Sequence, residues 1–334
     1  MKKRILTGDR PTGKLHLGHY VGSLQNRVKL QHEYDTFLII ADVQALTTNW
    51  ENPDQLGVDV REVAKDYLAV GIDPNVATIF VQSMVPSIAE LTIFYSMFVP
   101  VNVLRHNPTI KTEAAQKGYS ELMYGFLGYP VSQAADITFC RAHLVPVGKD
   151  QVPHLELTRK IVRRFNELYG EVFPEPEALV QQLLVGLDGN NKMSKSLDNA
   201  IYLSDPTEEL ARKVRNAVTD PARIRKNDPG HPEVCTVFTY QKQFNAGFVE
   251  ELETECRAGR IGCVDCKKRL TAVLDELLTP IRDRRAYYDA HPNEVEDILI
   301  SGTRRANDEG KLTLDLVRRA MKVDYFAHDK AGVA

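Results

Sequence analysis

The stretches Phe37-Leu38-Ile39-Ile40 and Thr78-Ile79-Phe80-Val81 decide the fold class, because short apolar runs of this kind form strands buried on both faces. Between them, apolar residues recur at helical spacing on one side of the chain: Val60, Val63, Ala64, Tyr67 and Leu68. Gly71 and Pro74 end this predicted helix. The order strand, helix, strand predicts a right-handed crossover within a parallel sheet that helices cover on both faces.

Further patterns extend this unit in both directions. Ile5-Leu6-Thr7 predicts a strand before it, and the apolar face between Ile161 and Tyr169, ended by a glycine, predicts a helix after it. Strand patterns nearly vanish after residue 204, where helical, charged sequence takes over. We therefore predict a doubly wound, Rossmann-like α/β domain over residues 1–204 and a helical domain over residues 205–334. Parallel sheets of this class bind ligands beyond the carboxyl ends of their strands.

Composition favours a globular protein and argues against a membrane-spanning or strongly basic one. The 334 residues, 43% hydrophobic and 26% charged, are typical of about two soluble globular domains. Lys and Arg number 42 against 45 Asp and Glu, so any site for a polyanion is a local patch. The apolar stretch Leu91–Leu104 is too short to span a membrane, which takes ~20 residues, and only Ile5 and Leu6 follow the charged start before Gly8. We expect a cytoplasmic protein with neither a membrane nor DNA as a partner.

The segment Gly8-Asp9-Arg10-Pro11-Thr12-Gly13-Lys14 matches most of the phosphate-loop pattern between a strand and a helix. That pattern continues with a Ser or Thr that holds magnesium, whereas Leu15 stands at this position. Pro11 also removes one of the backbone N–H groups that such a loop directs at phosphate. The sequence therefore disfavours a phosphate-loop NTPase.

The next motif, His16-Leu17-Gly18-His19, stands where a helix is expected to begin. A helix N-terminus has unpaired N–H groups and partial positive charge, which favour a triphosphate. Gly18 leaves room for a flat adenine, and His16 and His19 could donate hydrogen bonds to phosphate oxygens. Two surface histidines beside a packing glycine would explain the motif equally well.

A second motif, Lys192-Met193-Ser194-Lys195-Ser196, follows the turn-prone Asp188-Gly189-Asn190-Asn191. Its two lysines could both reach a triphosphate from a mobile loop and stabilise the departing pyrophosphate. In this order and spacing, the two motifs resemble the paired signatures of class I aminoacyl-tRNA synthetases. Those enzymes activate an amino acid with ATP.

Other segments along nearly the whole chain resemble bacterial tryptophanyl-tRNA synthetases. They are Thr7 to Gly13, Tyr129-Pro130 to Ala134-Ala135-Asp136-Ile137, Pro146 to Gln151, and His154 to Arg159. The resemblance implies a homodimer that activates L-tryptophan with ATP and passes the adenylate to tRNA(Trp). No carboxylate cluster typical of a Mg²⁺ site stands out in the sequence, so Mg²⁺ is expected to arrive with ATP.

The same resemblance implies the roles of individual residues. Asp136 would accept the indole N–H; a buried carboxylate deprived of its donor costs ~1–3 kcal/mol, which disfavours phenylalanine. Without the resemblance, Asp136 would be interpreted as a helix cap or a bridge in the core. Tyr129 would face the substrate ammonium, with Gln133 and Gln151 in the same site. The implied ATP ligands are Arg10, Pro11, Thr12, Gly18, His19, Gly148, Lys149, Asp150, Leu184, Lys192, Met193, Ser194, Lys195 and Ser196. The implied catalytic residues are His16, His19, Lys111, Lys192 and Lys195.

Three positions depart from the family pattern. The family often has Asn at the position of His19, an acidic residue at Lys149, and Met at Gln133. These departures change the expected contacts with the substrates and leave the reaction class unchanged.

Four of the five cysteines lie close together in the sequence: Cys235, Cys256, Cys263 and Cys266, separated by 20, 6 and 2 residues. Disulfides are rare in the cytoplasm, so four thiolates in a helical region suggest Cys₄ ligation of zinc or of an iron–sulfur cluster. The set also resembles a motif that holds a [4Fe–4S] cluster in a subset of bacterial tryptophanyl-tRNA synthetases. Cys140 stands apart and is expected in the core.

Two alternatives stay open at this point. A tyrosyl-tRNA synthetase would differ only in the side chain that enters the pocket, because tyrosine sites also use carboxylates. A tRNA-independent adenylyltransferase would share the His-x-Gly-His turn and the sheet. It would need neither the loop at Lys192–Ser196 nor a long helical C-terminal region.

Overall fold

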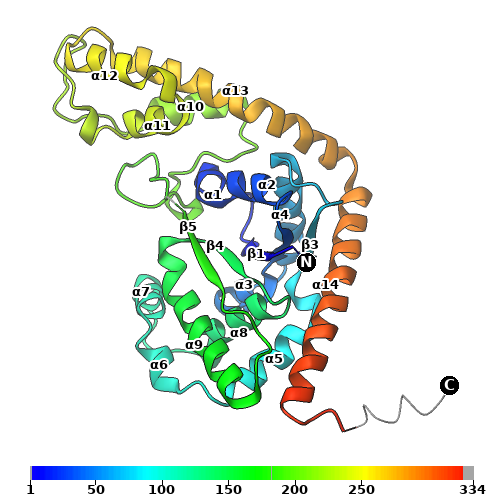
Figure 1. The fold of residues 1–334 in the computed structure, drawn as a ribbon. Coiled ribbons are helices and arrows are strands. Elements are labelled where there is room, and N and C mark those ends of the chain that lie inside the picture. The colour runs from blue at the N-terminus through cyan, green and yellow to red at the C-terminus, as the bar shows by residue number, and fades with distance from the viewer. Residues whose placement is uncertain (1, 182, 326–334) are drawn as a thin grey trace.

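A computed structural model describes residues 2–181 and 183–325, and it places a parallel five-stranded sheet at the centre of the molecule (Figure 1). The strands are β1 (Arg4–Asp9), β2 (Asp35–Ile40), β3 (Ala77–Val81), β4 (Leu144–Gly148) and β5 (Glu177–Gln181). Their order across the sheet is β3-β2-β1-β4-β5. In register, Ile5 of β1 pairs with Thr36 of β2 and Leu144 of β4. The predicted doubly wound sheet is confirmed, and its strand order reverses between β1 and β4.

Helices account for most of the remaining chain. Those of the sheet region are α1 (Leu17–His19), α2 (Gln25–Leu30), α3 (Asp42–Asn49), α4 (Leu56–Val70), α5 (Pro86–Ser96), α6 (Val101–Arg105), α7 (Pro108–Lys117), α8 (Tyr124–Thr138) and α9 (Val152–Tyr169). The later ones are α10 (Thr207–Asn216), α11 (Thr236–Phe244), α12 (Val249–Arg257), α13 (Cys263–Ala290) and α14 (Pro292–Ala320). Gly71 and Gly170 end α4 and α9 at φ values of +106° and +93°, which only glycine adopts readily. Both predicted helix ends are therefore confirmed. None of the described helices is long and apolar enough to cross a membrane.

The strands supply two apolar cores, one on each face of the sheet. Leu38, Ile40 and Ile79 pack on one face with α4 and α13, whereas Phe37, Ile39 and Phe80 pack on the other with α5, α8 and α9. Because side chains alternate along a strand, a continuous apolar run fills both cores. Cys140 is fully buried in the second core, as predicted.

The last two helices connect the helical region back to the sheet. α13 has 28 residues and runs from the helices farthest from the sheet to the side of α4 (Figure 1). α14 then follows the edge of the sheet at β3, where Thr303 Oγ1 accepts the N–H of Val81 at 3.3 Å. At Gly302 the helix comes so close that an added Cβ would lie 1.9 Å from the carbonyl oxygen of Ile79.

Candidate active site

The first signature motif forms the turn that follows β1. The helical run begins at Leu17, directly after His16, and continues through α1 and a π-helical segment, Tyr20–Leu24, into α2. The N–H groups of His19 and Tyr20 both donate to the carbonyl of His16, at 2.9 and 3.1 Å. This turn lies at the carboxyl end of β1, where the strand order reverses, and such a point is where a doubly wound sheet binds its ligand.

Both histidines of the motif are neutral at pH 7. Burial, the neighbouring His19 and Lys192 lower the pKa of His16 to about 3, although the charge of Asp9 raises it. Burial also lowers the pKa of His19, with Arg27 and Lys192 acting in the same direction and Asp9 against them. The Nδ1 atom of His19 accepts the backbone N–H of His16 at 3.2 Å, so its proton resides on Nε2. His19 is therefore a neutral N–H donor.

A buried ion pair beneath this turn was not anticipated from the sequence. Arg27 Nη1 and the hydroxyl of Tyr67 donate to Asp9 Oδ2 at 2.6 and 2.8 Å. Burial alone would raise the pKa of Asp9, but the charge of Arg27, the neighbouring His19 and these hydrogen bonds lower it to about 2. The one available signal was the position of Arg27 in the sequence, three residues after Leu24 and directly before Val28.

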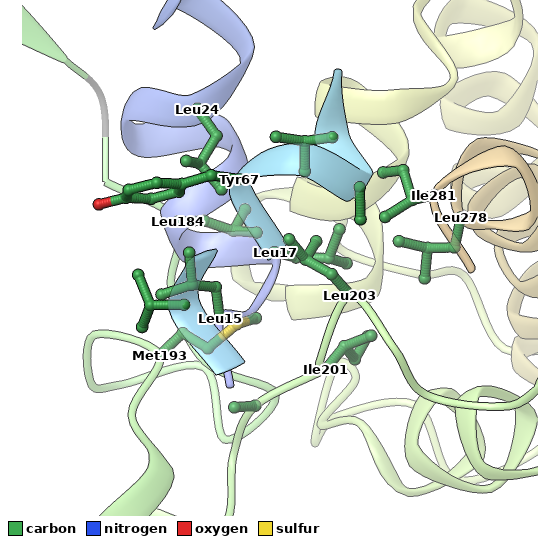
Figure 2. Packing of buried hydrophobic residues seen from close by; sticks show 14 of the residues in the cluster. Leu15, Leu17, Leu24, Tyr67, Leu184, Met193, Ile201, Leu203, Leu278 and Ile281 are labelled. Carbon is green, nitrogen blue, oxygen red and sulfur yellow. The ribbon is translucent and has the colours of Figure 1, made fainter. Parts of the chain in front are cut away.

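The lysine motif, 175 positions later, packs directly against the signature turn. The buried Met193 side chain contacts Gly18: an added Cβ there would lie 3.2 Å from the Cβ of Met193. Lys195 Nζ lies 3.4 Å from the carbonyl oxygen of Thr12. Figure 2 shows Met193 and Leu184 in one apolar cluster with Leu15 and Leu17. The structure thus brings the two motifs together.

The chain after the lysine motif fixes the backbone of the signature turn. Ile201 accepts the N–H of Leu17 at 2.9 Å, and Leu203 donates its N–H to Leu15 at 3.1 Å. Within the lysine motif, the side chain of Asn199 accepts the N–H of Ser194 at 2.7 Å. These contacts hold the two predicted phosphate-binding segments at one place.

Three of the four residues implied for the amino acid, Tyr129, Gln133 and Asp136, share one face of α8. Asp136 lies seven positions after Tyr129 and three after Gln133. It is buried, and it accepts the side-chain amide of Gln82 at 2.7 Å and that of Gln44 at 3.4 Å. Burial raises the pKa of Asp136 to about 7, against the lowering effect of both glutamines. Neither Gln44 nor Gln82 was singled out from the sequence, because both lie far from Asp136 in the chain.

Side chains also connect this face of α8 to the first signature segment. The hydroxyl of Tyr129 lies 2.8 Å from His154 Nε2 and donates to Glu113 at 3.2 Å. Glu113 in turn lies 3.7 Å from Arg10. Gln133 Nε2 donates to Gln151 at 3.4 Å, at the end of the short helical turn Lys149–Gln151 that follows β4.

The other predicted site residues differ in their exposure and in their distance along the fold from the two motifs. Gly148 ends β4 and Lys149 is exposed in the turn after it, next to the carboxyl end of β1. Lys111 is exposed on α7, and the described hydrogen bonds and ion pairs do not join it to either motif. Pro11 is buried in the signature loop. The side chains of Asp150 and Ser196 lie outside the described part of the structure.

The four clustered cysteines gather at the far end of the helical region. Cys235 precedes α11, Cys256 lies on α12, and Cys263 and Cys266 lie in the first turn of α13. Burial raises the pKa of the Cys266 thiol to about 11, and the other three thiols act on it in the same direction. Among the described residues, no group of three or more His, Cys, Asp or Glu side chains has a metal-binding arrangement.

An arginine lies against two of these thiols. Arg223 Nη1 lies 3.7 Å from the sulfur of Cys256 and 3.9 Å from that of Cys263. Its Nη2 donates to the carbonyls of Lys226 and Ile261 at 2.7 and 2.6 Å. The guanidinium is therefore fixed beside the sulfurs. Burial raises the pKa of the Cys256 thiol, and the charge of Arg223 opposes that rise.

Comparisons with known proteins agree with this geometry. The family model of the class I tRNA synthetases (W and Y) matches residues 1–279. The chain is 48% identical to the tryptophan–tRNA ligase of Lactococcus lactis subsp. lactis, covering 97% of this chain and 99% of that relative. It is also 48% identical to the tryptophan–tRNA ligase of Treponema pallidum, covering 95% and 96%. Among solved structures, the tryptophanyl-tRNA synthetase of Campylobacter jejuni, complexed with ADP and tryptophan, matches with a TM-score of 0.84 at 31% identity, covering 96% and 99%.

Proposed function

This chain belongs to the class I tRNA synthetases for tryptophan and tyrosine and acts as a tryptophan–tRNA ligase, and from this premise we propose how its residues divide the work. The carboxylate of tryptophan attacks the α-phosphorus of ATP, pyrophosphate leaves, and the adenylate is passed to the terminal ribose of tRNA(Trp). The observation that carries the function is identity at 48% to tryptophan–tRNA ligases over nearly the full length of both chains. It favours tryptophan over tyrosine and disfavours a tRNA-independent adenylyltransferase.

We propose that the signature turn and the lysine motif bind the triphosphate from two sides. Their contact through Gly18 and Met193, and the approach of Lys195 to Thr12, support this assignment. His19 would donate its Nε2 proton to a phosphate oxygen as a neutral imidazole. Lys192 and Lys195 would stabilise the charge that develops on pyrophosphate. Among the predicted ATP ligands only Asp150 is a carboxylate, so we assign Mg²⁺ to the incoming ATP.

For the amino acid, we propose that Asp136 accepts the indole N–H and that Tyr129, Gln133 and Gln151 surround the rest of the substrate. Asp136 is a buried carboxylate held by Gln82 and Gln44, so a ligand without a donor would leave it poorly paired. Such a site rejects phenylalanine, and the family resemblance favours indole over phenol.

The test is ATP–pyrophosphate exchange by the purified protein with tryptophan, with tyrosine and with no amino acid. Exchange with tryptophan alone is expected. Exchange with tyrosine would overturn the specificity, and the absence of exchange with both would overturn the activation step. Lys195→Ala and Lys111→Ala then compare two of the three lysines that are predicted to be catalytic.

We further propose that Cys235, Cys256, Cys263 and Cys266 hold a [4Fe–4S] cluster, with zinc as the alternative. The support is the donor chemistry of four cysteines on α12, α13 and the segment before α11, because thiolates are the ligands of either group; the described side chains are not themselves in a metal-binding arrangement. The bound group would hold α11, α12 and α13 together at the end of the region we assign to the tRNA anticodon. Anaerobic purification should give broad absorbance near 400 nm with bound iron. Bound zinc without iron would favour the alternative, and neither metal would refute both.

Two assignments concern the whole molecule. We propose a homodimer in the cytoplasm, the place of tRNA charging. Support for the dimer comes from exposed apolar side chains between the last turn of α5 and the start of α6, where Ile93, Met97 and Val101 are 55%, 68% and 54% exposed. Light scattering on the purified protein should give twice the chain mass, and Met97→Asp should shift it toward the monomer.

A further inference from the structure

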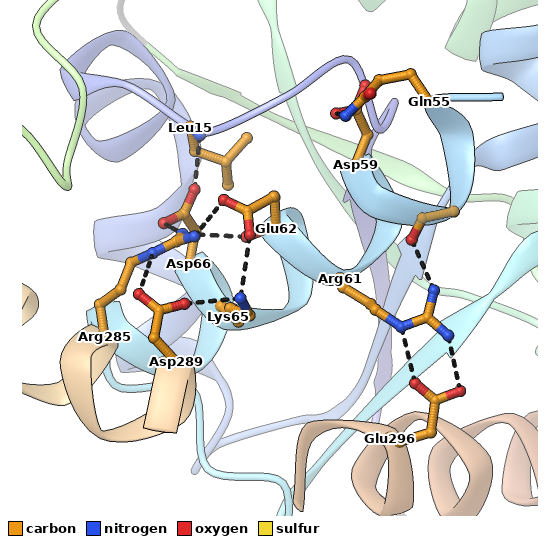
Figure 3. A network of polar contacts seen from close by, with 11 residues as sticks. Leu15, Gln55, Asp59, Arg61, Glu62, Lys65, Asp66, Arg285, Asp289 and Glu296 are labelled. Atoms are coloured by element: carbon orange, nitrogen blue, oxygen red, sulfur yellow. Dashed lines mark hydrogen bonds and ion pairs between the residues drawn. The ribbon is translucent and has the colours of Figure 1, made fainter. Parts of the chain in front are cut away.

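A buried carboxylate on α4 contacts the backbone of the ATP signature. The side chain of Asp66 is fully buried, and its Oδ2 atom accepts the backbone N–H of Leu15 at 2.7 Å (Figure 3). Leu15 directly precedes His16, the first residue of the signature turn. Asp66 therefore fixes the orientation of the peptide group at the entrance to this turn.

Leu15 is held on both of its backbone groups. Its N–H donates to Asp66, and its carbonyl accepts the N–H of Leu203 at 3.1 Å. Leu203 follows the lysine motif, so Leu15 is the point at which Asp66, the signature turn and the lysine motif meet. Loss of the Asp66 contact would leave a buried N–H unpaired at this junction, which destabilises its present orientation.

The charge of Asp66 is balanced by a residue of the helical region. Arg285, on α13 and 219 positions away, donates from Nη1 to the other oxygen of Asp66 and from Nη2 to Glu62. Only 4% of the Arg285 side chain is exposed. Lys65 closes the network, donating to Glu62 at 3.1 Å and to Asp289 at 2.7 Å (Figure 3).

This arrangement gives the two oxygens of one carboxylate different partners. One oxygen binds the ATP signature, and the other binds α13, the helix whose first turn carries Cys263 and Cys266. A buried Asp without its cation is poorly tolerated, so the contact with Leu15 depends on the placement of Arg285. Packing of α13 against α4 is thereby transmitted to the phosphate-binding turn.

We propose that Asp66 is a positioning residue for ATP, and that Arg285 makes its action depend on α13. The inference rests on the proposed ATP site and adds to it a direct connection from the helical region. Neither residue touches the substrates. They act by holding Leu15, so their loss should weaken ATP binding and leave tryptophan binding unchanged.

The test measures ATP and tryptophan affinity separately by titration calorimetry on the full-length protein. Asp66→Ala should weaken ATP binding about tenfold, and Asp66→Asn, which keeps an oxygen acceptor for Leu15, should weaken it less. Arg285→Ala should also weaken ATP binding. The double variant Asp66→Ala/Arg285→Ala should be no weaker than Asp66→Ala alone, because both residues act through one contact. Tryptophan affinity should stay within about twofold throughout.

Arg61→Ala is the matched control. Arg61 lies on the same helix and makes a two-point ion pair with Glu296 of α14, at 3.0 and 3.1 Å, but it does not contact the signature (Figure 3). ATP affinity in this variant should equal that of the wild type. If Asp66→Ala fails to fold, Asp66→Asn and Arg285→Ala still give the comparison.

Three outcomes would overturn the proposal: unchanged ATP affinity in the Asp66 and Arg285 variants, an equal loss of tryptophan affinity, or additive losses in the double variant. A wild-type protein that binds ATP without tryptophan-dependent exchange would refute the proposed function alone. The affinity comparison would still decide the role of Asp66.

Discussion

Replacing Asp136 by Asn should change how stability depends on pH. The free energy of unfolding of the variant, minus that of the wild type, should increase between low pH and pH 8. The folded carboxyl is buried, and burial raises its pKa from the ordinary 3.8 to about 7. Between these two values the folded chain keeps a proton that the unfolded chain has released. The contribution of Asp136 to stability is therefore fully present below the unfolded pKa and is lost as the pH rises through the folded pKa.

The magnitude follows from the width of this window. Each pH unit within it lowers the free energy of unfolding of the wild type by about 1.4 kcal/mol, or about 4 kcal/mol over the whole interval. Asn does not titrate, so the Asn variant does not share this loss. Any difference in the hydrogen bonds from Gln82 and Gln44 adds an offset that does not vary with pH.

Urea denaturation followed by circular dichroism, at intervals between pH 4 and pH 8, measures the difference between the two proteins. The variant should gain on the wild type as the pH rises, mainly between pH 4 and pH 7. The same variant should lose tryptophan-dependent pyrophosphate exchange by at least about tenfold, because Asn has a weaker acceptor for the indole N–H. A difference in stability that is flat with pH, or that slopes the other way, would refute the reasoning about burial.

Three further predictions concern other parts of the chain. Lys195→Ala should lower kcat of pyrophosphate exchange about 100-fold with little change in tryptophan affinity, since Lys195 is assigned to the leaving pyrophosphate; a matching fall in tryptophan affinity would contradict that assignment. Gly302→Ala should cost about 1–3 kcal/mol in urea denaturation, because its Cβ would lie 1.9 Å from the carbonyl of Ile79, whereas Gly57→Ala, whose nearest contact is 3.6 Å away, serves as the control. Cys266→Ser should abolish the absorbance near 400 nm of anaerobically purified protein, and full retention of bound iron would exclude Cys266 as a ligand.

Local patterns predicted the sheet and several helix ends. The apolar runs at Phe37–Ile40 and Thr78–Val81 form neighbouring strands, and Gly71 ends α4 as expected. These elements depend on neighbouring residues: strand burial needs a continuous apolar run, and a helix end needs a residue that adopts positive φ. The return of α14 to the sheet edge could not be predicted in this way. It depends on a close fit between Gly302 and Ile79, which no local pattern contains.

In the candidate site, too, short local motifs could be predicted from the sequence, whereas contacts between distant segments could not. The two signature motifs were recognisable because each is a short segment, and their contact followed from their joint function. The polar partners that support them come from distant segments: Gln82 for Asp136, Arg27 for Asp9, and Arg285 for Asp66. In the sequence, Arg285 belongs to a basic cluster on a helical segment, a pattern typical of a solvated face. Only the fold shows that it is buried and paired.

The contact between α14 and β3 has a consequence for how the chain is made. Val81 and Thr303, which join the strand to the helix, lie 222 positions apart. At about 5–20 residues per second, the ribosome adds the helix roughly 10–45 seconds after the strand. During that interval one edge of the nascent sheet has unpaired backbone groups that could pair with another chain. Loss of the C-terminal helix, by premature termination or by proteolysis, should therefore leave a protein that aggregates through β3.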